Sequence, residues 1–571
     1  MRKLRIIVSI PLLVFLGVMS FFIYRNNAVE SNINITHPFS NALFPPEFPA
    51  PLFEWWSEVN DTATYEVSLY TRNKKEIILA TTNEQSWRPE EAAWDRIKER
   101  SDFKKIYFSV KRKTDKKAAA VYFKISRDPV DAPVLYREMP IPFLIAEKKL
   151  DSMNFMLINF GSKQKPHIAM KGFSVCGNCH SFTADGREIG LDLDAGFRDK
   201  GGYFVSEVED TIQFELSNFR SWSKMEKRST FGLFSKLSPD GRHIVTTVKD
   251  RVLVKNFTFP PVENVYYSQL FFPVNGHLAV YDRQTNVLKE LPGANDPDYV
   301  HSNATWTADG QHIIFCRASA LPADTSVYDV TVKDEEIIDQ FVERKREFKY
   351  DLYIIPFNNG KGGVAKPIAG ASNNGKSNYF PAVSPDGKWL VFCQAENFML
   401  LMPDSRLYIV PVSGGEAREL KSNFNSMNSW HSWSPNSRWI VYASKGLSPF
   451  TDMFLTHIDE NGNASIPVLV DKARTSYRVI NYPEFVNRNP DKTFVMNYDF
   501  VEVAHIERAV KSGDLEKAKR LYYQMKQQDL YFFKEDYKHL SNLLERIGLY
   551  EEAEKCDELA NNTIDAAVFN N

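Results

Sequence analysis

The chain of 571 residues is longer than one ordinary hydrophobic core can organise, so we expect two to four domains. Hydrophobic residues make up 43% of it and charged residues 25%, which is ordinary for a globular protein. The formal net charge of −2 at pH 7 gives no argument for nucleic-acid binding, and we expect no nucleic-acid partner.

The N-terminal segment joins a basic flank to a long apolar run. Arg2, Lys3 and Arg5 precede residues 6–24, which carry no charge and could span the ~30 Å hydrocarbon layer of a bilayer. No small-residue cleavage site follows, so residues 1–28 are expected to be an uncleaved anchor rather than a cleaved export signal. The positive-inside rule then predicts a single-pass protein of the cell inner membrane, with the bulk of the chain periplasmic.

The next segment, residues 33–139, consists of short stretches of alternating apolar and polar residues with polar or Pro-rich connections. This alternation predicts a small β-sandwich. Its P-x-F-x-W start and the stretch TYEVSLY resemble fibronectin type III modules. Residues 140–180 lead into a cysteine motif and are expected to form a strap over whatever that motif holds.

One phrase recurs through residues 172–498, and it is clearest in LSPDGRHIVTTV, WTADGQHIIFCRA and VSPDGKWLVFCQA. An Asp-Gly turn between apolar runs predicts a hairpin, and a second hairpin follows each phrase. Two hairpins make a four-stranded blade, and six blades make a closed propeller without free sheet edges. The sixth phrase, FVNRNPDKTFVMNY, is degenerate. The turn positions are Asp185, Asp240, Asp309, Asp386, Asn436 and Asp491. The phrase resembles the TolB-like and WD40-like propeller repeats.

The last segment, residues 500–562, carries apolar residues at helical spacing. Gly513 and Gly548 stand 35 residues apart, so the segment resembles a tetratricopeptide repeat, whose period is ~34 residues. An ordinary helical hairpin that caps the propeller fits the pattern equally well. The fold class expected is therefore mainly β: an N-terminal β-sandwich, a six-bladed β-propeller and a small C-terminal α-helical segment.

The chemistry-bearing motif is CGNCH, which contains Cys176, Cys179 and His180. C-x-x-C-H is typical of c-type haem attachment, because the two thiols can reach both vinyl groups of one porphyrin and the histidine can then bind the iron as proximal ligand. We therefore expect one covalent haem c. A zinc site would need further ligands, a thioredoxin-like pair would open a helix, and a plain disulfide leaves His180 unexplained. These three alternatives stay open.

The distal side of such a haem has three candidate ligands just upstream of repeat hairpins. His301 and His431 are preferred over Met427, and a vacant site is a further possibility. His431 stands five residues before Asn436, the repeat position that His180 occupies before Asp185. Separately, Cys316 and Cys393 each follow their repeat aspartate by seven residues, and buried, inert thiols are expected there.

Taken together, the motif and the stretches YVHSNATWTADG, YDLYIIPFNNGKGG and NSWHSWSPNSRWIVYASK resemble a family of bacterial envelope proteins. That family combines a TolB-like propeller with one C-x-x-C-H motif, and some members carry tetratricopeptide-like helices. The resemblance runs from about Asp131 onward and implies a haem-bearing propeller without implying a reaction. A more distant similarity is to the propeller-plus-haem α subunit of hydrazine synthase, from which no activity is carried over.

Three functions follow as hypotheses. The first is a membrane-anchored periplasmic monohaem c-type cytochrome, in electron transfer or redox sensing, held to the inner membrane by its N-terminal helix and docked to a redox or protein partner. The second is a haem enzyme whose open coordination site acts on a peroxide or a small nitrogen species. The third is a haem-free scaffold whose propeller and helices bind proteins. Whether the chain is an enzyme is therefore open.

Overall fold

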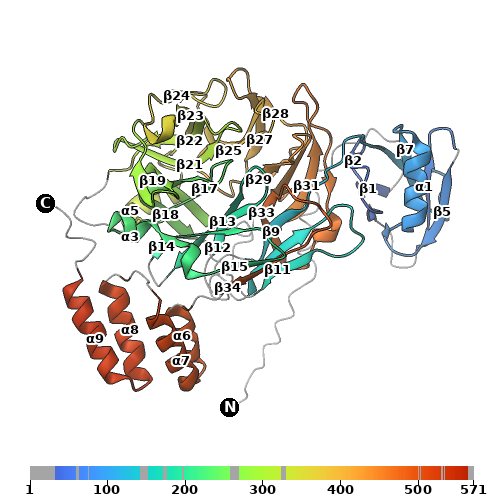
Figure 1. Cartoon of the computed structure of the whole chain (residues 1–571). Coiled ribbons are helices and arrows are strands. Elements are labelled where there is room, and N and C mark those ends of the chain that lie inside the picture. Colours follow the sequence, from blue (N-terminus) through green and yellow to red (C-terminus); the bar gives the residue numbers. More distant parts are fainter. Residues whose placement is uncertain are drawn as a thin grey trace, which may run out of the picture.

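The computed structural model describes residues 33–58, 63–74, 76–141, 152–171, 177–195, 199–257, 269–322, 330–498, 501, 503–528, 532 and 534–563. The fold is mainly β, with a large central body of sheets, a smaller N-terminal unit beside it and a group of C-terminal helices (Figure 1). The apolar segment 1–28 and Cys176 lie outside the described residues.

The predicted localisation in the inner membrane is wrong on what the structure describes. No helix among the described residues is both long and apolar enough to cross a bilayer. The longest of them, α8 (Lys534–Arg546) and α9 (Tyr550–Asn562), have 13 residues each. At ~1.5 Å per residue such helices reach only about 20 Å, which is short of the ~30 Å hydrocarbon layer. The single-pass membrane assignment is therefore withdrawn.

The N-terminal unit consists of two sheets and one helix. The sheets have the strand orders β1-β3-β6 and β2-β8-β7-β4-β5. Phe53 on one sheet and Phe108 on the other pack with ring centroids 4.5 Å apart, so the two sheets share a core. Trp94 of the helix is buried in the same core, where its indole N–H donates to the Phe48 carbonyl. The elements are β1 (Ile33–His37), β2 (Leu43–Phe44), β3 (Phe53–Ser57), β4 (Tyr65–Thr71), β5 (Ile77–Thr82), β6 (Ser86–Trp87), α1 (Glu91–Ser101), β7 (Ile106–Arg112) and β8 (Ala119–Ile125).

The central body, which we call the propeller body, contains six four-stranded sheets. Five of them follow one another along the chain, and each runs from an inner strand outward to a short outer strand. They are β12 (Gly177–Phe182), β13 (Glu188–Ala195), β14 (Asp199–Glu207) and β16 (Phe219–Ser221); β17 (Lys236–Leu237), β18 (His243–Asn256), β19 (Gln269–Asp282) and β20 (Val287–Glu290); β21 (Tyr299–Trp306), β22 (His312–Ser319), β23 (Asp351–Pro356) and β24 (Lys366–Pro367); β25 (Ser377–Val383), β26 (Trp389–Ala395), β27 (Arg406–Pro411) and β28 (Arg418–Glu419); β29 (Asn428–Trp433), β30 (Trp439–Ser444), β31 (Asp452–His457) and β32 (Val468–Leu469).

The sixth sheet joins distant parts of the chain. Its order is β11-β10-β9-β33, with β9 (Val134–Pro140), β10 (Asn154–Ile158) and β11 (His167–Lys171) placed before the other sheets in sequence and β33 (Arg478–Phe485) after them. The inner strands contact one another in a closed cycle, in the order β12, β17, β21, β25, β29, β33 and back to β12. Strands from both ends of the propeller body therefore close the ring of sheets.

The repeated turn has the same hydrogen bonds in five sheets. The Asp185 carboxylate accepts a 2.7 Å hydrogen bond from the Thr183 hydroxyl and a 3.1 Å hydrogen bond from the Arg187 backbone N–H. The equivalent hydroxyl pairs are Ser238–Asp240, Thr307–Asp309, Ser384–Asp386 and Ser434–Asn436. Gly186, which follows the aspartate, has a φ of 70°, a conformation that glycine adopts without strain. The recurring phrase is thus the sequence of one hydrogen-bonded turn.

Two expectations differ from the structure in this region. The sequence predicts a sixth hairpin in residues 485–498, but β33 does not pair with β34 (Val495–Tyr498), which instead runs parallel to β15 (Thr211–Phe214). Asn489 replaces the hydroxyl residue two positions before Asp491 and accepts the Asp491 backbone N–H, so the repeated turn does not form. Within residues 140–180, expected to be a strap, β10 and β11 instead extend the sixth sheet.

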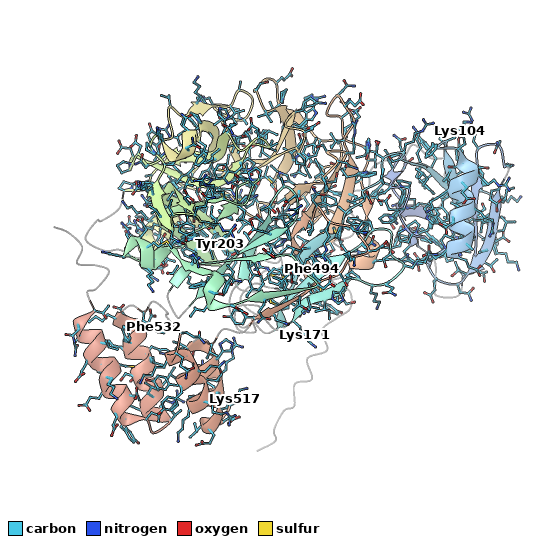
Figure 2. All side chains as sticks on the ribbon, in the orientation of Figure 1. Lys104, Lys171, Tyr203, Phe494, Lys517 and Phe532 are labelled. Carbon is cyan, nitrogen blue, oxygen red and sulfur yellow. The ribbon has the colours of Figure 1, made fainter. Side chains whose placement is uncertain are left out.

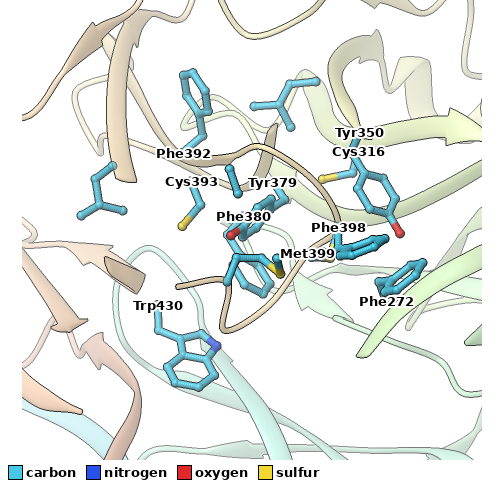
Figure 3. Close-up of a cluster of buried hydrophobic side chains, with 14 of the residues drawn as sticks. Phe272, Cys316, Tyr350, Tyr379, Phe380, Phe392, Cys393, Phe398, Met399 and Trp430 are labelled. Carbon is cyan, nitrogen blue, oxygen red and sulfur yellow. The ribbon is translucent and has the colours of Figure 1, made fainter. Parts of the chain in front are cut away.

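The interior of the propeller body is an aromatic-rich core. Figure 3 shows part of it, where Phe272 and Phe398 stack with ring centroids 5.0 Å apart. Cys316 and Cys393 lie in this core and are fully buried, as predicted. Burial raises the pKa of the Cys393 thiol to about 12 and raises that of Cys316 as well, so both are held in the unreactive thiol form.

The C-terminal helices form a separate bundle with its own core. They are α6 (Val503–Lys511), α7 (Leu515–Lys526), α8 and α9, and they pack as the pairs α6 with α7 and α8 with α9. Gly513 and Gly548 lie in the turns inside the two pairs, each at a positive φ. Short helices that cover the propeller body are α3 (Trp222–Glu226) and α5 (Glu335–Val342), with 3-10 turns η3 (Leu216–Asn218), η4 (Asn358–Gly360) and η5 (Asp471–Ala473).

Candidate functional site

The described part of the cysteine motif lies on β12, the inner strand of the first sheet. Cys179 is half-buried, and its thiol packs against the core of the propeller body. His180 is fully buried. The pairing of β12 with β13 shifts register between Gly177 and His180, so the motif coincides with a β-bulge. Of the two cysteines, Cys179 lies in the described part of the chain.

Four of the other five inner strands show the same register shift at the equivalent repeat position. Their registers shift between Ser302 and Thr305, and likewise in β25, β29 and β33. The residues at this position are Cys179, Phe234, Asn303, Phe380, Trp430 and Tyr482. All of them except Cys179 have a φ between 46° and 59°. β12 is therefore a variant of a backbone irregularity that recurs around the propeller body. Cys179 occupies a position that mainly carries aromatic residues in the other sheets.

A cavity of about 430 Å³ runs along the axis of the propeller body and is lined by residues from the inner strands of all six sheets. Asn303, Phe380, Trp430 and Tyr482 line it at the level of the bulges. The residues immediately before the Asp-Gly turns also line it, which places part of the cavity on the turn side of the body. This volume is within the range of sites that bind small molecules.

His180 has an apolar, aromatic environment. The rings of Phe155, Phe182 and Tyr482 surround it edge-on at centroid distances of 6.0, 5.9 and 5.2 Å. Within the described structure, neither Nδ1 nor Nε2 of His180 makes a hydrogen bond of good geometry, although the Leu135 backbone lies close enough to act on the ring as a weak partner. Burial lowers the pKa of His180 to about 3, and the nearby Leu135 backbone opposes that shift only in part. The imidazole is therefore held neutral, which is the form that can bind a metal.

His431 occupies the same repeat position as His180 and has a corresponding backbone neighbour. The Nε2 atom of His431 lies 3.1 Å from the Val391 carbonyl oxygen, on the second strand of the preceding sheet. Leu135 holds the corresponding place beside His180, because Leu135 pairs with Glu484 as Val391 pairs with Ala382. Burial lowers the pKa of His431 to about 4. His431 is half-buried and lines the cavity.

Two other predicted ligands lie elsewhere. His301 is fully buried on β21 between the rings of Tyr299 and Phe315, and its two ring nitrogens have no hydrogen-bond partner among the described residues. Burial lowers its pKa to about 4. Met427 is fully buried in the hydrophobic core just before β29. Neither residue lines the axial cavity.

Four ionisable residues around the motif were not expected. Arg137 of β9 donates a hydrogen bond to the Gly177 carbonyl and so holds the start of β12. Burial raises the pKa of Cys179, and the buried Asp192 carboxyl adds to the shift. Burial raises the pKa of Glu484 to about 7, and the ammonium of Lys236 opposes that rise. Clusters of perturbed ionisable groups are typical of functional sites.

The sequence did contain a signal for two of these residues. Ser181, Lys236, Thr305, Ala382, Ser432 and Glu484 occupy equivalent positions in the six inner strands and all line the cavity. Four of them are small and uncharged, so Lys236 and Glu484 are the exceptions in the pattern. A comparison of the repeats position by position would have singled them out. Arg137 and Asp192 lie outside the recurring phrase and gave no such signal.

The described residues contain no group of three or more His, Cys, Asp or Glu side chains that could hold a metal ion. A zinc site formed by the described side chains alone is therefore not present. The described residues fit haem attachment at His180. Its buried ring nitrogens make no hydrogen bond of good geometry to the described residues, beside a half-buried thiol on Cys179.

No protein-family model matches the chain, and no curated protein matches it. Among solved structures, TolB from Acinetobacter baumannii is 14% identical, over 67% of this chain and 79% of that one, with a TM-score of 0.38. Hydrazine synthase from Kuenenia stuttgartiensis is 12% identical, over 61% of this chain and 88% of that one, with a TM-score of 0.29. The β-propeller domain of Cps50 (Swd1) from Myceliophteria thermophila is 11% identical, over 56% of this chain and 80% of that one, with a TM-score of 0.30. At these identities and TM-scores the similarity concerns the type of fold and does not extend to function.

Proposed function

We propose that the chain is a monohaem c-type cytochrome, with one haem attached through Cys176 and Cys179 and His180 as its proximal ligand. The observation that carries the proposal is the state of His180: a neutral, fully buried imidazole whose two ring nitrogens make no hydrogen bond of good geometry to the described residues, directly after the thiol of Cys179. A buried polar group without a partner is unfavourable unless another ligand satisfies it. Haem iron would satisfy one of the two nitrogens.

The domain organisation belongs to the same proposal. The cycle of six inner strands supports a six-bladed TolB-like β-propeller. The two sheets that share a core, in residues 33–125, support a fibronectin III-like sandwich for most of the predicted span 33–139, whose last strand, β9, belongs to the sixth sheet of the propeller body. The paired helices of residues 500–562 support a tetratricopeptide-like module, with Gly513 and Gly548 at equivalent turns. The propeller would then serve as the frame of the haem site rather than as a separate domain.

The residues of the site have distinct tasks in this proposal. A bound haem supplies one-electron chemistry at the iron. His180 is held in place by Phe155, Phe182 and Tyr482, and its burial keeps the imidazole unprotonated. Arg137 holds the strand that carries Cys179 by donating to the Gly177 carbonyl. Glu484 places a carboxyl beside the imidazole, where outer groups commonly tune a metal ligand.

For the distal side we propose His431 before His301 and Met427. His431 lines the axial cavity, and the Lys236 ammonium acts electrostatically on both His180 and His431. Electron transfer or redox sensing is the role that suits a single six-coordinate haem. One haem carries an electron only a short way, so a closely docked redox partner belongs to the proposal.

A second candidate function is a haem enzyme with an open coordination site, acting on a peroxide or a small nitrogen species. The axial cavity favours it, because small molecules could enter from the turn side of the propeller body. A haem-free scaffold that binds proteins through the propeller and the helices is the third candidate.

Absorbance spectra of protein matured in cells that attach haem c separate these functions. A cytochrome gives a low-spin spectrum with a sharp α band after dithionite, and that spectrum does not change when carbon monoxide is added. An enzyme with an open site gives a high-spin spectrum that shifts with carbon monoxide. Absence of any haem absorbance would overturn both and leave the scaffold.

A further inference from the structure

β5 is a long, unprotected sheet edge in the N-terminal unit. It is the last strand of the order β2-β8-β7-β4-β5 and pairs with β4 without a register shift. Its six residues, IILATT, contain no charge and no proline. Ile77 is 47% exposed and Leu79 is 74% exposed. Proteins protect edge strands with charges, prolines and bulges, and the six described residues of β5 contain none of these.

The outer strands of the propeller body are protected in these ways. β24 and β28 have two residues each, Lys-Pro in the first and Arg-Glu in the second. β20 has four residues and ends with Lys-Glu. Short, charged or proline-containing edges do not serve as templates for a further strand. The same chain therefore shields these outer edges and leaves β5 open.

The backbone pattern of the hairpin determines which residues of β5 offer hydrogen-bonding groups. The Thr71 backbone N–H donates to the Glu76 carbonyl at 3.2 Å, just before β5 begins. Hydrogen-bonded and non-hydrogen-bonded pairs alternate along an antiparallel ladder. Because the register continues without a shift, the backbone groups of Ile77, Leu79 and Thr81 point away from β4. Among the described residues, no other hydrogen bond uses these groups.

These three residues are complementary to a second copy of themselves. When two β5 strands lie antiparallel with Leu79 opposite Leu79, Ile77 of each copy faces Thr81 of the other, and all three pairs can form hydrogen bonds. A shift by one residue would place Leu79 opposite Ala80, whose backbone groups already point towards β4. The side chains of Ile77, Leu79 and Thr81 are all exposed and share one face. They therefore become cross-strand neighbours in this register.

The charges that flank β5 fit the same register. Lys74 precedes the strand and Glu84 follows it, and both are exposed. Neither side chain makes an ion pair within the described part of the chain. With Leu79 on the two-fold axis, Lys74 of each copy lies opposite Glu84 of the other. Opposite charges at facing positions favour the pairing, and the symmetry places such a pair at both ends.

We propose that the chain forms a two-fold symmetric dimer through antiparallel pairing of β5, which joins its five-stranded sheet to the same sheet of a second copy. β5 lies on the side of the N-terminal unit away from the propeller body (Figure 1), and Figure 2 shows side chains of the unit projecting outward on this side. An edge contact of this length buries less surface than a standard interface, so the dimer is expected to be weak and dependent on concentration.

Sedimentation velocity of the full-length protein over a wide range of concentration tests the proposal. Wild type is expected to shift from monomer to dimer, with no larger species, because the symmetry is closed. Leu79→Lys places two ammonium groups against each other on the axis and is expected to raise the dissociation constant at least about tenfold. Leu79→Pro is expected to do the same, because proline removes an outward N–H that the fold itself does not use.

Exchange of the flanking charges tests the register. Lys74→Glu and Glu84→Lys are each expected to weaken the dimer several-fold, because like charges then face each other at both ends. The double variant Lys74→Glu/Glu84→Lys restores opposite charges and is expected to dimerise as wild type does. A double variant as weak as the two single variants together would overturn the antiparallel pairing.

Val364→Lys is the matched control, because Val364 is 75% exposed, as Leu79 is, but lies in the connection before β24. It is expected to dimerise as wild type does, and the dimer is expected with or without haem. A wild type that stays monomeric would overturn the proposal and leave β5 to a strand of a different protein. A dimer that is unaffected by Leu79→Lys and Leu79→Pro, in protein that melts as wild type does, would overturn it too.

Discussion

The Nε2 atom of His180 lies 4.0 Å from the Oε2 atom of Glu484, and neither atom makes a hydrogen bond of good geometry to the described residues. The two residues come from β12 and β33, the inner strands that meet where the propeller body closes. Closure therefore places a buried carboxyl beside a buried imidazole. The pKa of the imidazole is lowered and the pKa of the carboxyl is raised, both mainly by burial, so each is driven towards its neutral form.

Glu484→Gln is expected to stabilise the haem-free Cys176→Ala/Cys179→Ala protein in a pH-dependent way. The pKa of Glu484 is about 7 in the folded protein against 4.5 as an ordinary value, so the folded state binds the extra proton between these pH values. Stability therefore falls as pH rises through this window, and the full penalty is present above pH 7. The glutamine removes that penalty. The gain in the free energy of unfolding is expected to be about 3 kcal/mol at pH 8 and to vanish at pH 4.

Urea unfolding at pH 5 and pH 8 measures this difference. Glu460→Gln in the same background is the control, because its carboxylate is exposed and pairs with Arg438 on the surface. It is expected to change stability by less than about 0.5 kcal/mol at either pH. A Glu484→Gln effect of the same size at both pH values would show that this carboxyl is ionised throughout and that its environment is not as described.

The distal ligand is expected to respond to substitution of His431 and not of the other two candidates. In haem-loaded protein, His431→Gln should convert a low-spin spectrum to a high-spin one that responds to carbon monoxide. His301→Leu and Met427→Leu should leave the spectrum unchanged, because both side chains are buried outside the axial cavity. A spectral change in either of these leucine variants, with none in His431→Gln, would show that the distal haem ligand lies outside the cavity.

His301→Leu has a second expected effect, on acid stability. The pKa of His301 is about 4 in the folded protein against 6.5 as an ordinary value, so the unfolded state binds the extra proton between these pH values. Stability is therefore lost as pH falls through this window, and the leucine variant should lose less of it. Urea midpoints at pH 7 and pH 4.5 measure the difference. Equal loss in both proteins would contradict the buried, neutral state of His301.

Much of the propeller body was predictable from the sequence, for a local reason. The phrase with Asp185 and its equivalents encodes one turn, in which a hydroxyl and a backbone N–H donate to the same carboxylate oxygen. Such local hydrogen bonds require particular residue types at a fixed spacing, and that spacing can be recognised in the sequence. The sixth sheet has no such local pattern, because β9 pairs with β33 across most of the chain.

The candidate site was predictable in its motif and not in its surroundings. Cys179 and His180 are adjacent in sequence, so their motif can be read directly. The carboxyl of Glu484 and the guanidinium of Arg137 reach the motif from the closing strands, and only the folded structure brings them together. The localisation failed because it rested on residues 6–24 alone, while the helices that the structure describes are too short to cross a bilayer.

Asp471 is expected to hold the N-terminal unit to the propeller body. Its carboxylate accepts hydrogen bonds from the Leu52 backbone N–H and the Arg88 guanidinium, and only 4% of its side chain is exposed. Asp471→Ala leaves both donors without this acceptor and should cost about 1.5–3 kcal/mol. Urea unfolding with limited proteolysis of residues 33–125 measures the loss. Asp210→Ala, which removes an exposed partner of Arg488, should cost less than about 1 kcal/mol. Equal effects of the two substitutions would show that this contact does not hold the N-terminal unit to the propeller body.

Covalent haem attachment tests the central claim most directly. Intact-mass spectrometry of denatured protein, from cells that mature haem c, should show one added haem on wild type and on Cys393→Ala, whose buried core thiol serves as the control. It should show none on Cys176→Ala/Cys179→Ala. His180→Gln should keep the added mass but lose the low-spin spectrum, because the cysteines and not the histidine form the covalent bonds. Wild-type protein without added haem mass, or with haem retained after both motif cysteines are replaced, would contradict the account.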